Sequence, residues 1–127
     1  MRKTMHILKD EHNQSPVPSA WRGTLSAIVE AFKEGDFSLT RKVPGVRSIP
    51  EKKATRIAGN IKSYGARLAS LPEDAWQTSV CQWMGAYWDV MVDLYTVEEG
   101  ASDLVLQARV YEEGVTYAFD VHFVYVP

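Results

Sequence analysis

The chain has 127 residues, of which 46% are hydrophobic and 24% are charged, so it can bury the core of one ordinary domain. These proportions exclude wholesale disorder. The single cysteine, Cys81, excludes an internal disulfide and any multi-cysteine zinc site. No apolar run reaches the roughly 18 residues of a membrane span, and the charged N-terminus has no secretory signal. We therefore expect a cytoplasmic protein without a membrane partner.

The net charge of −2 is divided unevenly along the chain. Residues 1–71 hold thirteen of the fourteen Lys and Arg and six carboxylates, whereas residues 72–127 hold Arg109 and ten carboxylates. The two parts carry formal charges of +7 and −9. Either they neutralise each other, or one charged face is free for an oppositely charged partner.

Residues 1–18 show no sustained periodicity, and Pro16 and Pro18 favour extended backbone there. This stretch is predicted to be an N-terminal arm that is partly flexible. No repeat or linker divides the remainder, so residues 19–127 are predicted to form a single domain.

Two amphipathic helices are predicted where apolar residues recur at helical spacing, over residues 19–34 and 48–70. Ser19 is expected to cap the first helix, and Gly35 to end it. The second is expected to begin with a capping box formed by residues 48–51.

The apolar period then changes to two, which predicts antiparallel strands over residues 87–95, 103–111 and 115–126. A further strand is predicted over residues 77–84. Glu113-Gly114 is expected to form a hairpin turn. The fold class that follows is α+β, with two amphipathic helices packed on one face of an antiparallel sheet of three to five strands.

The register of each predicted hairpin follows from the need to keep one apolar face buried. Leu94 is placed opposite Leu104 in the first hairpin, and Glu112 opposite Val115 in the second. With these registers, Val115 and Phe123 face the core together with the apolar residues of the other strands.

The opposite face of the sheet carries carboxylates, tyrosines and other polar side chains. Asp89 lies directly opposite Arg109, and the two are expected to pair. Simple solvation would account for such a face, but its mixture of charge and aromatic rings is closer to a binding surface. The predicted partner-binding residues, with the loops at its ends, are Asp89, Asp93, Tyr95, Glu98, Glu99, Asp103, Gln107, Arg109, Tyr111, Asp120 and His122.

No catalytic motif stands out. Asp89 and Asp93 are about 13 Å apart along one strand, too far for a glycosidase pair. Asp120 and His122 share a face and provide an alternative, a small enzyme or ligand-binding site, although no nucleophile stands beside them. The histidine spacing fits no zinc site and no Gly-rich phosphate loop is present, so neither a metal nor a cofactor is expected.

A basic cluster offers a third alternative, nucleic-acid binding. Its members are Arg41, Lys42, Arg47, Lys52, Lys53 and Arg56. No aromatic residue is interleaved with them, and the overall pI is 5.9. A solvated helix face is therefore the preferred interpretation, and nucleic acid is not the expected partner.

The segments Trp83–Leu94 and Glu98–Leu106, with Ile28–Phe32 and the closing Val124–Pro127, resemble a small bacterial domain of unknown function. In size and acidity the chain is similar in type to the immunity proteins of contact-dependent growth inhibition and related polymorphic-toxin systems. That resemblance implies a non-enzymatic protein that neutralises a cognate toxin domain, such as a basic nuclease, through an acidic, aromatic-bearing surface. The oligomeric state is left open.

Overall fold

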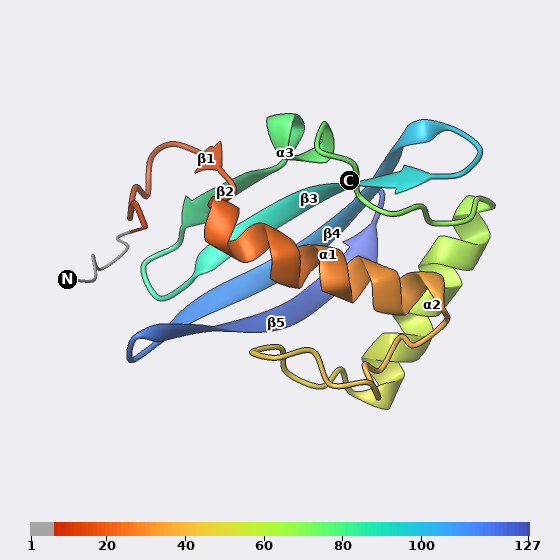
Figure 1. Cartoon of the computed structure of the whole chain (residues 1–127), viewed down its shortest axis with the longest axis horizontal. Helices are drawn as coiled ribbons and strands as arrows, with labels where there is room; N and C mark the ends of the chain where they lie inside the picture. Colours follow the sequence, from red (N-terminus) through yellow and green to blue (C-terminus); the bar gives the residue numbers. More distant parts are fainter. Residues whose placement is uncertain (1–6) are drawn as a thin grey trace.

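Residues 7–127, which the computed structural model describes, form an antiparallel sheet with helices over one side (Figure 1). The helices within this range are α1 (Ser19–Lys33), α2 (Glu51–Tyr64) and α3 (Ala75–Thr78). The strands are β1 (Ser15–Pro16), β2 (Val80–Trp83), β3 (Trp88–Thr96), β4 (Gly100–Glu113) and β5 (Thr116–Tyr125), and they lie side by side in chain order. The predicted α+β fold class is confirmed.

The core lies between α1 and the side of the sheet that α1 covers, which we call the inner face. The apolar stripe of α1 is fully buried there, at Trp21, Leu25, Ile28, Val29, Ala31 and Phe32. Trp21 packs edge-on against Trp88 of β3, with 5.3 Å between the ring centroids. Each of these tryptophans is 1% exposed, so together they anchor the helix to the sheet.

Both long helices begin differently from the prediction. Pro18 and Pro50 occupy the N-cap positions of α1 and α2, and neither helix has a side-chain capping hydrogen bond there. The expected Ser19 cap and the capping box over residues 48–51 are therefore wrong. The second helix also ends earlier than expected, at Gly65, whose φ of 86° is left-handed and therefore favours glycine.

The predicted register of β3 and β4 is confirmed over most of the hairpin, where Asp89 opposes Arg109. The placement of Leu94 opposite Leu104 is wrong, because the ladder is irregular at that point. The Ser102 hydroxyl occupies the irregularity: it donates to the Leu94 carbonyl at 2.7 Å and accepts the Leu104 N–H at 3.1 Å. These bonds replace the regular pairing.

The turn between β4 and β5 lies one residue later than predicted. Glu113 pairs with Thr116, so the two-residue loop is Gly114-Val115. Gly114 has the positive φ, 62°, that the first position of such a turn requires. Val115 is consequently 99% exposed at the tip instead of contributing to the core.

A bulge in β5 reverses the predicted orientation of the end of that strand. Ala108 of β4 pairs with Val121, and Gln107, which precedes it on β4, pairs with Phe123. His122 is therefore the extra, unpaired residue of the bulge. Phe123 is therefore half-buried on the side of the sheet away from α1, and the residue after it takes the core position.

The outer edge of β5 is closed by α2 and by the connector that precedes it. Lys53 donates from Nζ to the Val121 carbonyl at 3.1 Å, and Asn60 donates from Nδ2 to the Val124 carbonyl at 2.9 Å. The backbone of residues 45–47 forms further hydrogen bonds with the same strand. These contacts hold α2 alongside β5 and position the groove between them.

The predicted N-terminal arm contacts the sheet at several points within residues 7–18, although residues 8, 9 and 11–14 are exposed; residues 1–6 lie outside the described residues. Pro16 belongs to β1, and Val17 is only 1% exposed. The Trp88 indole donates from Nε1 to the carbonyl of Leu8 at 2.9 Å. Residues 7–18 are thus part of the packed structure.

Candidate functional site

The face of the sheet opposite α1, which we call the outer face, carries most of the predicted partner-binding residues. In β3, its side chains Asp89, Met91, Asp93 and Tyr95 are half-buried, while those between them are fully buried on the inner face. The β4 and β5 residues opposite them are Val105, Gln107, Arg109, Tyr111, Ala118, Asp120, Phe123 and Tyr125. Within residues 7–127 no helix crosses this face (Figure 1).

Long side chains lie flat across one end of the outer face. The guanidinium of Arg109 stands 4.7 Å from the ring centroid of Tyr87, and that of Arg47 stands 4.7 Å from the ring of Tyr111. The two tyrosine rings are 5.5 Å apart. Cation–π contacts of this kind hold each guanidinium against a ring, so this end of the face has a fixed shape.

The expected ion pair between Asp89 and Arg109 is not formed. Both carboxylate oxygens of Asp89 instead accept hydrogen bonds from Nε2 of Gln107, at 3.0 and 3.1 Å, because the Arg109 guanidinium is stacked on Tyr87. Within residues 7–127, neither Asp89 nor Asp93 has a Lys, Arg or His nitrogen within 4.0 Å. Within the described residues, no ion pair therefore offsets these two carboxylates on the partly exposed outer face.

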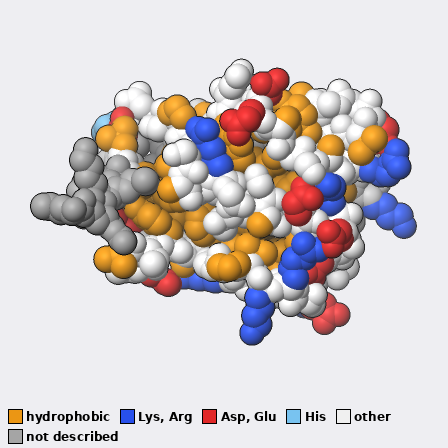
Figure 2. Space-filling view, viewed as in Figure 1, with side chains coloured by type: hydrophobic (Ala, Val, Ile, Leu, Met, Phe, Trp, Pro, Cys, Tyr) orange, Lys and Arg blue, Asp and Glu red, His pale blue; other side chains and the backbone are white. Residues whose placement is uncertain are grey.

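Other carboxylates of the acidic part are paired with bases of the basic part. These pairs are Lys9–Glu112 at 2.8 Å, Arg47–Glu113 at 3.6 Å, Arg47–Asp120 at 3.8 Å and Arg67–Glu98 at 2.9 Å. On the side that carries α1, basic and acidic side chains also lie side by side (Figure 2). Neutralisation between the two parts of the chain is thus real, but it does not extend to Asp89 and Asp93.

The predicted residues Glu98, Glu99 and Asp103 lie at the end of the β3–β4 hairpin. The backbone N–H and the guanidinium of Arg67 bond to Glu98, and these hydrogen bonds lower the pKa of that carboxyl. The Tyr64 hydroxyl donates to Glu99 at 3.0 Å and accepts the N–H of Asp103 at 3.1 Å. The hairpin end is therefore held by α2 and the segment that follows it.

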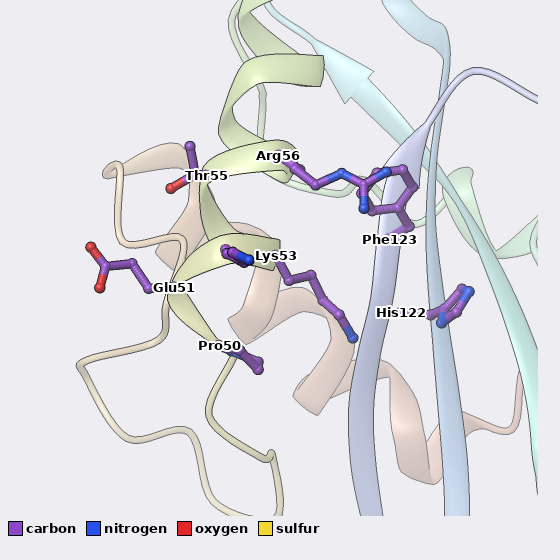
Figure 3. A pocket seen from close by; sticks show the side chains of 8 residues that line it. Pro50, Glu51, Lys53, Thr55, Arg56, His122 and Phe123 are labelled. Atoms are coloured by element: carbon purple, nitrogen blue, oxygen red, sulfur yellow. The ribbon is translucent and has the colours of Figure 1, made fainter.

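His122 is separated from the acidic outer face by the bulge and lines a groove of about 880 Å³ between α2 and β5 (Figure 3). The lining residues are Pro50, Glu51, Lys52, Lys53, Thr55, Arg56, His122 and Phe123. The groove thus combines His122 with three bases of the predicted basic cluster. Sequence reasoning missed Phe123 as a site residue, because it predicted a core position; the bulge moves the side chain to the other side of the sheet, where it is only partly buried against the core.

Asp120 and His122, the residues of the alternative enzyme or ligand-binding site, form no ion pair with each other. The carboxylate of Asp120 is bound by Arg47 at 3.8 Å. Burial lowers the pKa of His122; the positive charges of Arg109 and Lys53 lower it further, while Asp89 and Asp120 act in the opposite direction.

Cys81 and the metal-ligating residue types add no reactive centre to the described part of the chain. Cys81 is 3% exposed, and burial raises the pKa of its thiol to about 11, so it packs as a small apolar side chain. Among residues 7–127, no three His, Cys, Asp or Glu side chains gather as a metal ion would require. None of the described helices has the length and hydropathy to cross a bilayer.

Comparison with protein families matches residues 29–127 to a domain of unknown function, DUF7668. The chain belongs to this family. Neither the curated proteins nor the solved structures include a match. The DUF7668 region begins within α1 and contains β2 to β5 and both walls of the groove. The matched family has no assigned function, so the resemblance to immunity proteins stays a prediction.

Proposed function

We propose that this DUF7668 protein is a non-enzymatic binding protein that holds a basic protein partner against its outer face. The partner class that we favour is a bacterial toxin domain, which the protein would neutralise as immunity proteins do. The observation that supports this proposal is the pair of carboxylates, Asp89 and Asp93, on a half-open sheet face with no cation of residues 7–127 within 4.0 Å.

The surroundings of these carboxylates suit a protein interface. Met91 lies between them on β3, and Tyr95 follows at the end of the strand, each half-buried by its neighbours. Unpaired charges of one sign speed the capture of an oppositely charged surface, while partly exposed Met and Tyr side chains supply apolar contact area. Contact with these groups requires no unfolding of the domain.

The direct test replaces both carboxylates by their neutral isosteres, in the variant Asp89→Asn/Asp93→Asn. The matched control, Glu73→Gln/Asp74→Asn, removes two exposed charges just before α3, away from the outer face. Tagged wild type, variant and control are used to capture partners from the native cell, and the affinity of the captured protein is then measured at several salt concentrations. Equal thermal midpoints establish that all three are folded.

We expect the captured partner to carry a net positive charge. Wild type and control should bind it with the same affinity, and the variant should bind it at least about tenfold more weakly. The captured domain should arrest growth when expressed alone, and co-expression of wild type, but not of the variant, should restore growth. An acidic partner, a harmless one, or equal affinity for the variant would contradict the proposal. Loss of function in Asp120→Asn or His122→Gln alone would favour the alternative enzyme or ligand site.

A further inference from the structure

The groove between α2 and β5 is a second candidate site, and its chemistry differs from that of the outer face. Lys52, Lys53 and Arg56 project from α2 along one wall, and among residues 7–127 none of them has a carboxylate oxygen within 4.0 Å. The bases that do form ion pairs are Lys9, Lys33, Arg41, Arg47 and Arg67. The groove is therefore positive although the chain as a whole is negative.

The first turn of α2 adds to this positive character. The groove runs along Pro50, Glu51 and Lys52, and no side chain caps the amino end of this helix. The Glu51 side chain points away from β5, whereas Lys53 and Arg56 extend toward it (Figure 3). Free N–H groups at a helix amino end attract anions, and phosphate is a common occupant of such positions.

The opposite wall supplies an aromatic surface. The guanidinium of Arg56 stands 5.1 Å from the ring centroid of Phe123. The Tyr125 ring does not line the groove, but it stacks beside Phe123 at 6.1 Å with an interplanar angle of 29°. Planar bases stack on aromatic rings and on guanidinium groups in proteins that bind single-stranded nucleic acid. The fold thus places aromatic side chains beside the basic cluster, although none is interleaved with the cluster in the sequence.

We propose that this groove binds a nucleotide, with its phosphate at Lys52, Lys53 and the amino end of α2, and its base against Phe123 and Arg56. A volume of about 880 Å³ is ample for such a ligand. A free mononucleotide and one unit of single-stranded nucleic acid present the same phosphate and base. The site needs neither Asp89 nor Asp93, although Phe123 belongs to the outer face as well as to the groove.

The pKa of His122, followed by NMR, should report whether a phosphate binds in the groove. It lines the groove, and burial with the positive charges of Arg109 and Lys53 keeps its pKa low, opposed by Asp89 and Asp120. A phosphate bound close to Lys53 adds negative charge, so the pKa of His122 should rise on binding.

The test is an NMR titration of the full chain with adenosine monophosphate, and separately with inorganic phosphate, at low salt. Lys52→Ala should weaken both ligands about tenfold, because it removes a phosphate contact. Phe123→Leu should weaken adenosine monophosphate about tenfold and leave inorganic phosphate unchanged, because only the base is stacked. Lys62→Ala, at the other end of α2, is the matched control and should change neither affinity.

Should Phe123→Leu fail to fold, the exposed Arg56→Gln replaces it: this variant should weaken adenosine monophosphate more than inorganic phosphate, because it removes a charge that attracts both ligands and a planar group that only the base contacts. Oligouridylate and uridine monophosphate are then compared, to distinguish single-stranded nucleic acid from a free nucleotide as the ligand. Tighter and more salt-sensitive binding of oligouridylate identifies single-stranded nucleic acid. Equal binding of the two identifies a free nucleotide. The proposal is overturned if no ligand shifts the resonances of residues 52–56 and 122–123. It is equally overturned if Phe123→Leu and Arg56→Gln bind adenosine monophosphate as wild type does.

Discussion

The two faces of the sheet are made by alternate residues of the same strands, yet they are stabilised in different ways. On β3, Val90 and Val92 are fully buried under α1, whereas Met91 between them is half-exposed. Within residues 7–127 no helix covers the outer face, although side chains lie across one end of it, such as Arg109 over the ring of Tyr87 and Arg47 over the ring of Tyr111. The same strands thus bury their inner face in the core and leave their outer face partly exposed.

Adjacent substitutions on β4 give the sharpest contrast between the faces. Leu106 is 0% exposed on the inner face, so Leu106→Ala should lower the free energy of unfolding by about 2–5 kcal/mol. Gln107 points to the outer face, and Gln107→Ala removes only its hydrogen bonds to Asp89, which we expect to cost less than about 1.5 kcal/mol. Urea unfolding measures both, and similar losses would contradict the division between the faces.

A smaller effect concerns the pH dependence of stability that arises from His122 in the groove between α2 and β5. The pKa of His122 in the folded protein lies below its ordinary value of 6.5, so the unfolded chain binds more protons in that interval. Stability should therefore fall as the pH drops from 6.5 toward the lowered pKa. The thermal midpoint of wild type should decrease more than that of His122→Gln between pH 7.5 and pH 5.5. Parallel decreases in the two proteins would show that His122 has no such effect.

The inner face was largely predictable from sequence, because burial imposes a strict pattern on helices and strands. The buried stripe of α1 follows from that pattern. The register of β3 and β4 follows from it too, and this register places Asp89 opposite Arg109. The start of α2 was not predictable in this way, since Ser48 and Glu51 carry a capping motif while Pro50 takes the cap position.

The groove between α2 and β5 could not be predicted from the alternation of residues along the strands. Near the end of β5, Phe123 and Tyr125 alternate with Val124 and Val126, so either set could face the core. The bulge at His122 decides between them and brings Phe123 beside the bases of α2. The groove could therefore be recognised only once the strand was placed against the helix.

Thiol labelling tests the central claim, that the outer face is open and receives the partner. Cys81 is buried and has a raised pKa, so the natural chain should react slowly and serve as background. Met91→Cys should react readily in the free protein, and at least about tenfold more slowly once the captured partner is bound. The control Val115→Cys, at the exposed hairpin tip, should react at the same rate with and without the partner. Labelling of Met91→Cys at the same rate with and without the partner would contradict the account.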